Sequence, residues 1–157
     1  MKFSVLKSPI YTSLLLLRKM MLKTHSFPLR VYIEDTDAEG MVYYANYLKF
    51  AERARTECLR SIGINHAEMI KKDGLMFVVR SCHLNCLASG RLDDVLEIKT
   101  HFKKVGGVKV EVSQSITREA RVIATLEVVL ACINSASKPV RLDANLANKL
   151  KTYFGEI

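Results

Sequence analysis

The apolar residues between positions 45 and 62 recur every three to four residues, which is the spacing of one face of an amphipathic helix. The charged residues of this segment, mostly arginine and glutamate, fall largely off that face. Gly63 follows at once, and glycine commonly ends a helix because it adopts the left-handed conformation without strain. We therefore expect a long helix over 45–62 that is buried along one stripe, made of Tyr47, Phe50, Ala51, Ala54, Cys58 and Ile62.

Apolar and polar residues alternate with a period of two in most other segments, which predicts strands. Strands are expected over 29–33, 75–84, 95–105, 108–116 and 121–133, and shorter helices over 66–72 and 144–154. The pair Gly106–Gly107 indicates a two-residue hairpin turn, and another turn is expected over 117–120. The order is one strand, the long helix and then four strands in an antiparallel meander, an α+β arrangement. One helix covers only one face of such a sheet, so a homodimer in which the sheets join or pack is also predicted.

The composition fits a single globular domain, with 157 residues, 49% apolar and 25% charged. No apolar run approaches the ~18 residues that cross a bilayer, so stable membrane insertion is not expected. Residues 1–20 hold four basic residues and no acid, which is half of the net charge of +8. We therefore separate a basic extension, residues 1–25, from a domain over 26–157. The extension is interpreted as an over-long start that precedes Met20 or Met21, or alternatively as an amphipathic segment on a membrane surface.

The cysteines and histidines do not form a recognisable metal or cofactor site. Cys82 and Cys86 have no second cysteine pair, the four histidines are scattered, and no Ser-His-Asp set or phosphate-binding glycine loop is present. The four cysteines are therefore expected to be buried free thiols of a cytoplasmic protein. Nucleic acid is not expected as a partner, because aromatic residues are not interleaved with the basic ones.

An acidic loop joins the first strand to the long helix and holds the leading catalytic candidate. Four carboxylates lie within residues 34–39, and Gly40 follows them. A loop of this length can fold back so that the carboxylate of Asp37 faces the free N–H groups at the start of the helix, an arrangement suited to acyl transfer. The alternative is that Asp35 or Asp37 only orders the loop as an Asx turn or a helix cap. Asn46 is a plausible cap for the same helix.

Tyrosines and basic residues supply candidate contacts to a substrate. Tyr43 and Tyr47 line a pocket at the helix start, or else pack in the core with their hydroxyls at the surface. Lys103 and Lys104 beside the glycine hairpin, with Arg118 before the next turn, are suited to a nucleotide phosphate, or are ordinary charged hairpin ends. The glutamates of the long helix are expected to pair with its arginines, and a catalytic helix carboxylate is the less favoured alternative.

Five segments together resemble the hotdog-fold acyl-CoA thioesterases, and in particular the YbgC-like, Tol–Pal-associated branch of the 4-hydroxybenzoyl-CoA thioesterase family. The segments are RVYIEDTD at 30–37, GMVYYANYL at 40–48, ERARTE at 52–57, RLDD at 91–94 and VVLACI at 128–133. The resemblance covers roughly residues 27–143 and leaves out the segment before Ser26.

The resemblance implies a five-stranded antiparallel sheet wrapped around one long central helix, with subunits that join their sheets as dimers and pair into tetramers. It implies an active site at the subunit interface that hydrolyses acyl-CoA, with short aliphatic or aromatic acyl groups and no cofactor. The catalytic aspartate of the family's Asp-x-Asp-x-x-Gly pattern corresponds to Asp37, and the backbone N–H that faces the thioester carbonyl corresponds to Tyr44. The alternatives are a thioesterase for acyl carrier protein, or a non-catalytic partner in an envelope or lipid-synthesis complex.

Two positions depart from the pattern of that branch. Many members carry histidine where this chain has Tyr44, and many carry tyrosine where it has Ile33. A backbone N–H survives the first change, so the expected role of Tyr44 as an oxyanion donor stands, whereas a role of an imidazole is lost.

Overall fold

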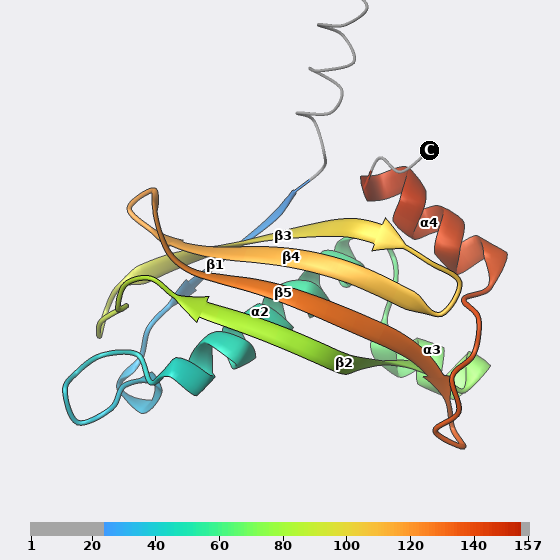
Figure 1. Ribbon diagram of the computed structural model, residues 1–157, viewed down its shortest axis with the longest axis horizontal. Helices are drawn as coiled ribbons and strands as arrows, with labels where there is room; N and C mark the ends of the chain where they lie inside the picture. Colours follow the sequence, from blue (N-terminus) through green and yellow to red (C-terminus); the bar gives the residue numbers. More distant parts are fainter. Residues whose placement is uncertain (1–23, 155–157) are drawn as a thin grey trace, which may run out of the picture.

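A computed structural model of the protein describes residues 24–154, which fold into a five-stranded sheet around one long helix (Figure 1). The strands and helices follow one another as β1 (His25–Arg30), the 3-10 turn η1 (Ile33–Asp35), α2 (Tyr44–Ser61), α3 (His66–Asp73), β2 (Leu75–Cys86), β3 (Val95–Val105), β4 (Lys109–Arg118), β5 (Arg121–Asn134) and α4 (Ala144–Phe154). No helix among these residues is long and apolar enough to cross a membrane.

All strand pairs are antiparallel, but their order is β1-β3-β4-β5-β2, so the predicted four-strand meander is wrong at one end. β2 pairs with β5 instead of with β3. The connection over residues 87–94 crosses the end of the sheet: Leu87 N–H bonds the carbonyl of Ile123 in β5, and the carbonyl of Asp94 accepts from Val31, just after β1. A meander needs a short turn between neighbouring strands, and this connection is too long to act as one.

The first strand lies earlier than the sequence pattern predicted. It covers His25–Arg30 instead of 29–33, and Ile33 belongs to the 3-10 turn η1. The strand includes Pro28, which is tolerated because β1 is at the edge of the sheet and pairs only with β3. The predicted extension over 1–25 lies outside the described residues, except that His25 already belongs to β1.

The two hairpin turns also differ from the expectation. Three residues, 106–108, separate β3 from β4 instead of the two glycines alone. β4 continues to Arg118, and the next turn is made by Glu119 and Ala120, whose φ angles are +47° and +67°. Positive φ angles at both central residues match the twist of a hairpin. Such turns are usually recognised from asparagine, aspartate or glycine at these positions, so the pair of glutamate and alanine did not predict one.

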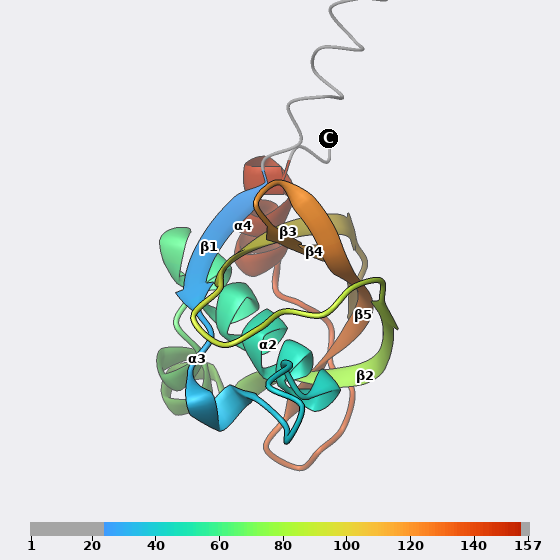
Figure 2. The same cartoon turned by 90° about the vertical axis from the view of Figure 1, so that its left-hand side faces the viewer.

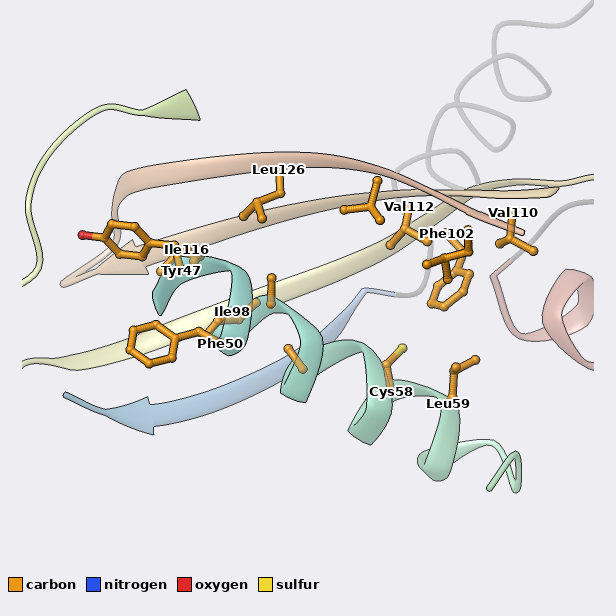
Figure 3. Close-up of a cluster of buried hydrophobic side chains, with 14 of the residues drawn as sticks. Tyr47, Phe50, Cys58, Leu59, Ile98, Phe102, Val110, Val112, Ile116 and Leu126 are labelled. Carbon is orange, nitrogen blue, oxygen red and sulfur yellow. The ribbon is translucent and has the colours of Figure 1, made fainter. Parts of the chain in front are cut away.

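α2 starts and ends within one residue of the predicted helix and buries the predicted apolar stripe except Ile62, which follows the helix as its C-cap and is half-buried. It packs in the concave side of the sheet beneath β1 and β3 (Figure 2). Phe50 and Cys58 point from the helix toward the sheet, where Ile98 and Leu126 belong to the same buried cluster (Figure 3). The helix thus supplies one side of the core and fixes where its own first residue lies.

The four cysteines divide into two pairs by exposure. Cys58 and Cys132 are buried, and burial raises the pKa of Cys58 to about 12. Cys82 and Cys86, both in β2, are exposed, so the expectation that all four thiols are buried is wrong for these two. Both lie on the face of β2 that looks toward α2, since their neighbours across the ladder, Val128 and Ala124, are buried there.

A buried polar network ties the middle of α2 to the sheet. Arg55 donates to Gln114 Oε1 at 2.6 Å, while Gln114 Nε2 donates to the carbonyl of Ala51 and to Thr100 Oγ1, each at 2.9 Å. Arg55 also pairs with Glu52 on the helix surface, which confirms the predicted glutamate–arginine pairing. The network satisfies a cation inside the protein, where an unpaired one costs several kcal/mol.

Gln114→Met is therefore expected to lower the free energy of unfolding by about 1–3 kcal/mol, because Arg55 and the carbonyl of Ala51 each lose a buried partner. Urea denaturation followed by circular dichroism measures this change. Glu111→Gln, an exposed change on the same strand, serves as the control and is expected to stay within about 0.5 kcal/mol. Equal stability of the two variants would show that the network does not contribute.

Candidate active site

The loop between η1 and α2 folds back on itself, as the sequence predicted. Thr36 and Val42 form an antiparallel bridge, and inside it Asp37 N–H donates to the carbonyl of Met41 at 2.8 Å. The N–H of Gly40 returns to the carbonyl of Asp37 at 3.0 Å. Gly40 has a φ of +69°, which a residue without a side chain adopts most easily. These bonds hold Asp37 at the beginning of a closed turn directly before the helix.

The carboxylate of Asp37 orders this turn with one of its two oxygens. Oδ1 accepts the N–H of Glu39 at 3.1 Å and that of Met41 at 3.2 Å. Oδ2 has no hydrogen-bond partner among residues 24–154, and the side chain is partly exposed. The predicted loop-ordering role is therefore present, and it leaves one carboxylate oxygen available to a bound molecule.

Asp35, the last residue of η1, anchors the start of α2. Its carbonyl accepts the N–H of Tyr43 at 2.9 Å and the side-chain amide of Asn46 at 2.8 Å. Its buried carboxylate accepts the N–H of Tyr32 at 2.9 Å. Asn46 is thus not the helix cap that the sequence suggested; it lies inside the first turn, and the cap position belongs to Tyr43.

The amino end of α2 has free N–H groups. The side chain of Tyr43 makes no capping hydrogen bond, and the first turn contains no acidic residue. Asn46 N–H bonds the carbonyl of Tyr43, but the N–H groups of Tyr44 and Ala45 have no acceptor within the described part of the chain. Such N–H groups carry the positive end of the helix dipole, so this position stabilises negative charge on an oxygen.

The three tyrosines of this region lie in different surroundings. Tyr43 and Tyr44 are 47% and 60% exposed, their rings are 4.9 Å apart, and the hydrogen bond between their side chains raises the pKa of Tyr43. Tyr47 is only 2% exposed, its hydroxyl accepts the N–H of Gly90 at 2.9 Å, and burial raises its pKa. Tyr43 and Tyr44 are thus placed to meet a ligand at the surface, whereas Tyr47 points into the protein.

The three basic candidates are divided between the two ends of the sheet. Arg118 is at the same end as Asp37, where it bonds the carbonyl of Ser89 and the carboxylate of Asp94, both at 3.1 Å. Lys103 pairs with Glu127 at 3.2 Å near the other end. It lies eight residues beyond Val95, where β3 begins, a separation of roughly 25 Å along a strand.

Lys104 belongs to that other end as well, beside the β3–β4 hairpin. It lines a cavity of about 460 Å³ together with Lys109, Arg141 and one acid, Glu111. Figure 1 shows this hairpin next to α4, at the opposite end of the sheet from the loop that holds Asp37. One subunit therefore does not bring Lys103 or Lys104 beside Asp37.

Two parts of the site were missed by sequence reasoning. The carbonyl of Asp35 holds the start of the helix, and Gly90 lies between the loop and the helix, with its carbonyl accepting Val42 N–H at 2.9 Å. The hydrogen bonds of a backbone carbonyl cannot be predicted from residue types. For Gly90, the only sequence signal nearby was the RLDD segment that follows it. Within residues 24–154, no group of three His, Cys, Asp or Glu side chains is placed to hold a metal ion.

Comparison with known proteins identifies thioesterases as relatives, both by sequence and by fold. A thioesterase superfamily model matches residues 39–125. The acyl-CoA thioesterase YbgC of Haemophilus influenzae is 39% identical over 116 residues, covering 73% of this chain and 85% of that protein. The acyl-CoA thioester hydrolase YbgC of Escherichia coli O6:H1 is 37% identical over 127 residues, covering 80% of this chain and 94% of that protein.

Among solved structures, a probable thioesterase from Bartonella henselae is 38% identical and superposes with a TM-score of 0.74, covering 76% of this chain and 99% of that one. The resemblance to hotdog-fold thioesterases that the sequence motifs indicated is thereby confirmed, as are the α+β sheet around one long helix and the assignment to the thioester hydrolases. This chain belongs to the thioesterase superfamily.

Proposed function

We propose that this protein hydrolyses acyl-CoA thioesters to free CoA and a carboxylic acid, with Asp37 and the backbone of Tyr44 as its catalytic groups. The observation that carries the proposal is the uncapped start of α2, where the N–H of Tyr44 is free next to the loop that holds Asp37. The names of the two YbgC relatives support the acyl-CoA substrate.

The backbone N–H of Tyr44 polarises the thioester carbonyl and stabilises the negative charge that develops on its oxygen in the transition state. A donor of this kind is worth ~10²–10³ in rate, because it is already oriented and needs no reorganisation. The N–H of Ala45 is also unbonded within the described residues and lies at the same end of the helix.

Asp37 acts by one of two routes that give the same products. As a nucleophile, its free oxygen attacks the carbonyl carbon, the C–S bond breaks, CoA leaves as the thiol after gaining a proton, and water hydrolyses the mixed anhydride. As a general base, it takes a proton from a water whose oxygen attacks the carbonyl, and the C–S bond then breaks. In both routes one water is consumed for each thioester.

The phosphates of CoA require basic contacts, which the three basic candidates of one subunit do not supply together. Arg118 is held by Ser89 and Asp94, while Lys103 and Lys104 lie at the far end of the same subunit. Contacts of one CoA with Lys103 or Lys104 and with Asp37 therefore require a second subunit. The chain's own groups near Asp37 that face outward are Tyr43 and Tyr44, which suit the pantetheine or acyl portion.

We also propose a dimer formed along β2, in line with the predicted joining of sheets. β2 pairs with β5 on one edge only, and Val79 is 47% exposed although it faces the same side as the buried Leu130. An open strand of 12 residues with exposed apolar side chains is a template for pairing with another chain. A second copy covers this edge and the concave surface beside it, and dimers then pair into tetramers.

Asp37→Asn is expected to lower kcat/KM for acyl-CoA by about 10²–10⁴-fold, because the amide neither attacks the carbonyl nor accepts the proton of water. Hydrolysis of a panel of aliphatic and aromatic acyl-CoA thioesters, followed by thiol release, measures it. Glu39→Gln in the same loop is the matched control and keeps wild-type rates. Wild-type turnover by Asp37→Asn would refute the mechanism.

Tyr44→Pro tests the backbone donor directly. Proline is favourable at the first position of a helix but has no N–H, and Tyr43 already has the extended conformation (φ −60°, ψ 126°) that a residue before proline requires. We expect kcat about 10²–10³-fold below that of Tyr44→Ala, which keeps the N–H, with unchanged circular dichroism. Tyr44→Phe is expected to be mild. Equal rates for the proline and alanine variants would exclude the backbone donor, and a large loss in Tyr44→Phe would move the chemistry to the phenol.

Val79→Asp is expected to shift the protein toward monomer, because a charge on the open edge of β2 opposes pairing. Sedimentation velocity at micromolar concentrations measures the shift. Val122→Asp, an exposed valine on β5 away from that edge, serves as the control and keeps the wild-type assembly. A dimer that survives Val79→Asp, or a wild-type monomer, would contradict pairing through β2.

A further inference from the structure

Gly90 connects the Asp37 loop to the catalytic helix through its own backbone. Its carbonyl accepts the N–H of Val42, which closes the loop, and its N–H donates to the hydroxyl of Tyr47 on α2, each at 2.9 Å. Met41 and Arg91 form a further antiparallel bridge beside these bonds. The loop and the helix are therefore connected through the backbone of Gly90, which lies more than 40 residues later in the sequence.

This junction has no spare room. Gly90 is buried, and a Cβ placed on it would lie 3.0 Å from Val42 Cγ2 and 3.4 Å from the hydroxyl of Tyr47. The first separation is shorter than carbon atoms tolerate without movement of a neighbour. The distance between the loop and the helix is thus set by direct contact of backbone and side chains, and not by a flexible linker.

Arg118 fixes the segment that carries Gly90. One nitrogen of its guanidinium donates to the carbonyl of Ser89 and to Oδ2 of Asp94, both at 3.1 Å. The same Oδ2 accepts the N–H of Arg91 at 2.7 Å, so the residues on both sides of Gly90 are tied to one carboxylate–guanidinium pair. This pair is largely shielded from water, which strengthens it compared with an exposed one.

We infer that Tyr47 and Arg118 are positioning residues for the hydrolysis: through Gly90 and Val42 they set the place of the Asp37 carboxylate relative to the start of α2. Arg118 thus acts through Ser89 and Asp94 and does not contact the substrate, and Tyr47 acts through the N–H of Gly90. This inference rests on the proposed function, because it assigns to these two residues the alignment of the groups named there. Misplacement of a reacting group by about 1 Å can cost 10²-fold in rate, so a small shift of Val42 is sufficient.

Tyr47→Phe keeps the buried ring and removes only the acceptor of the Gly90 N–H. It is expected to lower kcat about 10-fold or more, with KM for the acyl-CoA unchanged within about twofold. The decisive comparison repeats Tyr47→Phe in the Asp37→Asn background. Since the hydroxyl acts by placing Asp37, the second substitution is expected to reduce the residual kcat by less than about twofold there.

A merely structural role predicts a different pattern. A loss of folded protein would lower kcat by the same factor in both backgrounds, and thermal unfolding of each variant determines whether it is folded at the assay temperature. Equal factors in the two backgrounds, or wild-type kcat in Tyr47→Phe, would overturn the positioning role of Tyr47.

Arg118→Gln is the second variant, with Arg121→Gln on the other side of the β4–β5 turn as its matched control. Arg118→Gln is expected to lower kcat about 10-fold with little change of KM, whereas a phosphate contact would raise KM instead. Arg121→Gln is expected to keep both constants within about twofold. A raised KM at unchanged kcat in Arg118→Gln would overturn the inference in favour of substrate binding.

The two proposals fail in distinguishable ways. If Asp37→Asn is inactive while Tyr47→Phe and Arg118→Gln have wild-type kcat, only the positioning role is wrong. If Asp37→Asn hydrolyses acyl-CoA at the wild-type rate, the proposed catalytic role of Asp37 is wrong, and the positioning role fails with it.

Discussion

The rest of the site depends on a helix whose first N–H groups are left without an acceptor. Loss of a capping side chain costs a helix about 0.5–2 kcal/mol, and here Tyr43 in the cap position offers no such bond. The helix is held instead by the carbonyl of Asp35, which bonds Tyr43 and Asn46, and by the burial of its apolar face. The interactions that stabilise the start of α2 therefore involve neighbouring groups and not the N–H groups of Tyr44 and Ala45. Those two N–H groups stay available to an oxyanion.

Local patterns were sufficient to predict most of the helices and strands. The limits of β3 and α4 agree with the expectation at both ends, and those of α2 agree within one residue. The apolar stripe of α2 identified the core correctly because a period of three to four residues is a property of the helix alone. The fold-back of the Asp37 loop could also be expected, because its length and the glycine at position 40 are local features.

Long-range relations were not accessible in the same way. β2 lies beside β5 because residues 87–94 cross the end of the sheet, and no local signal distinguishes such a crossing from a long turn. Asn46 looks like a helix cap by residue type, yet its amide is used by a carbonyl 11 residues earlier. Charge was equally ambiguous: Lys103 and Arg118 suggested one anion site, but they lie at opposite ends of the sheet, each beside an acid that the sequence did not identify.

The close approach at Gly90 has a consequence for how this part of the chain tolerates change over evolutionary time. The side chains at positions 90 and 42 share one small volume, so a larger residue at one demands a smaller residue at the other. Substitutions at these two sites are therefore expected to arise as compensating pairs among relatives.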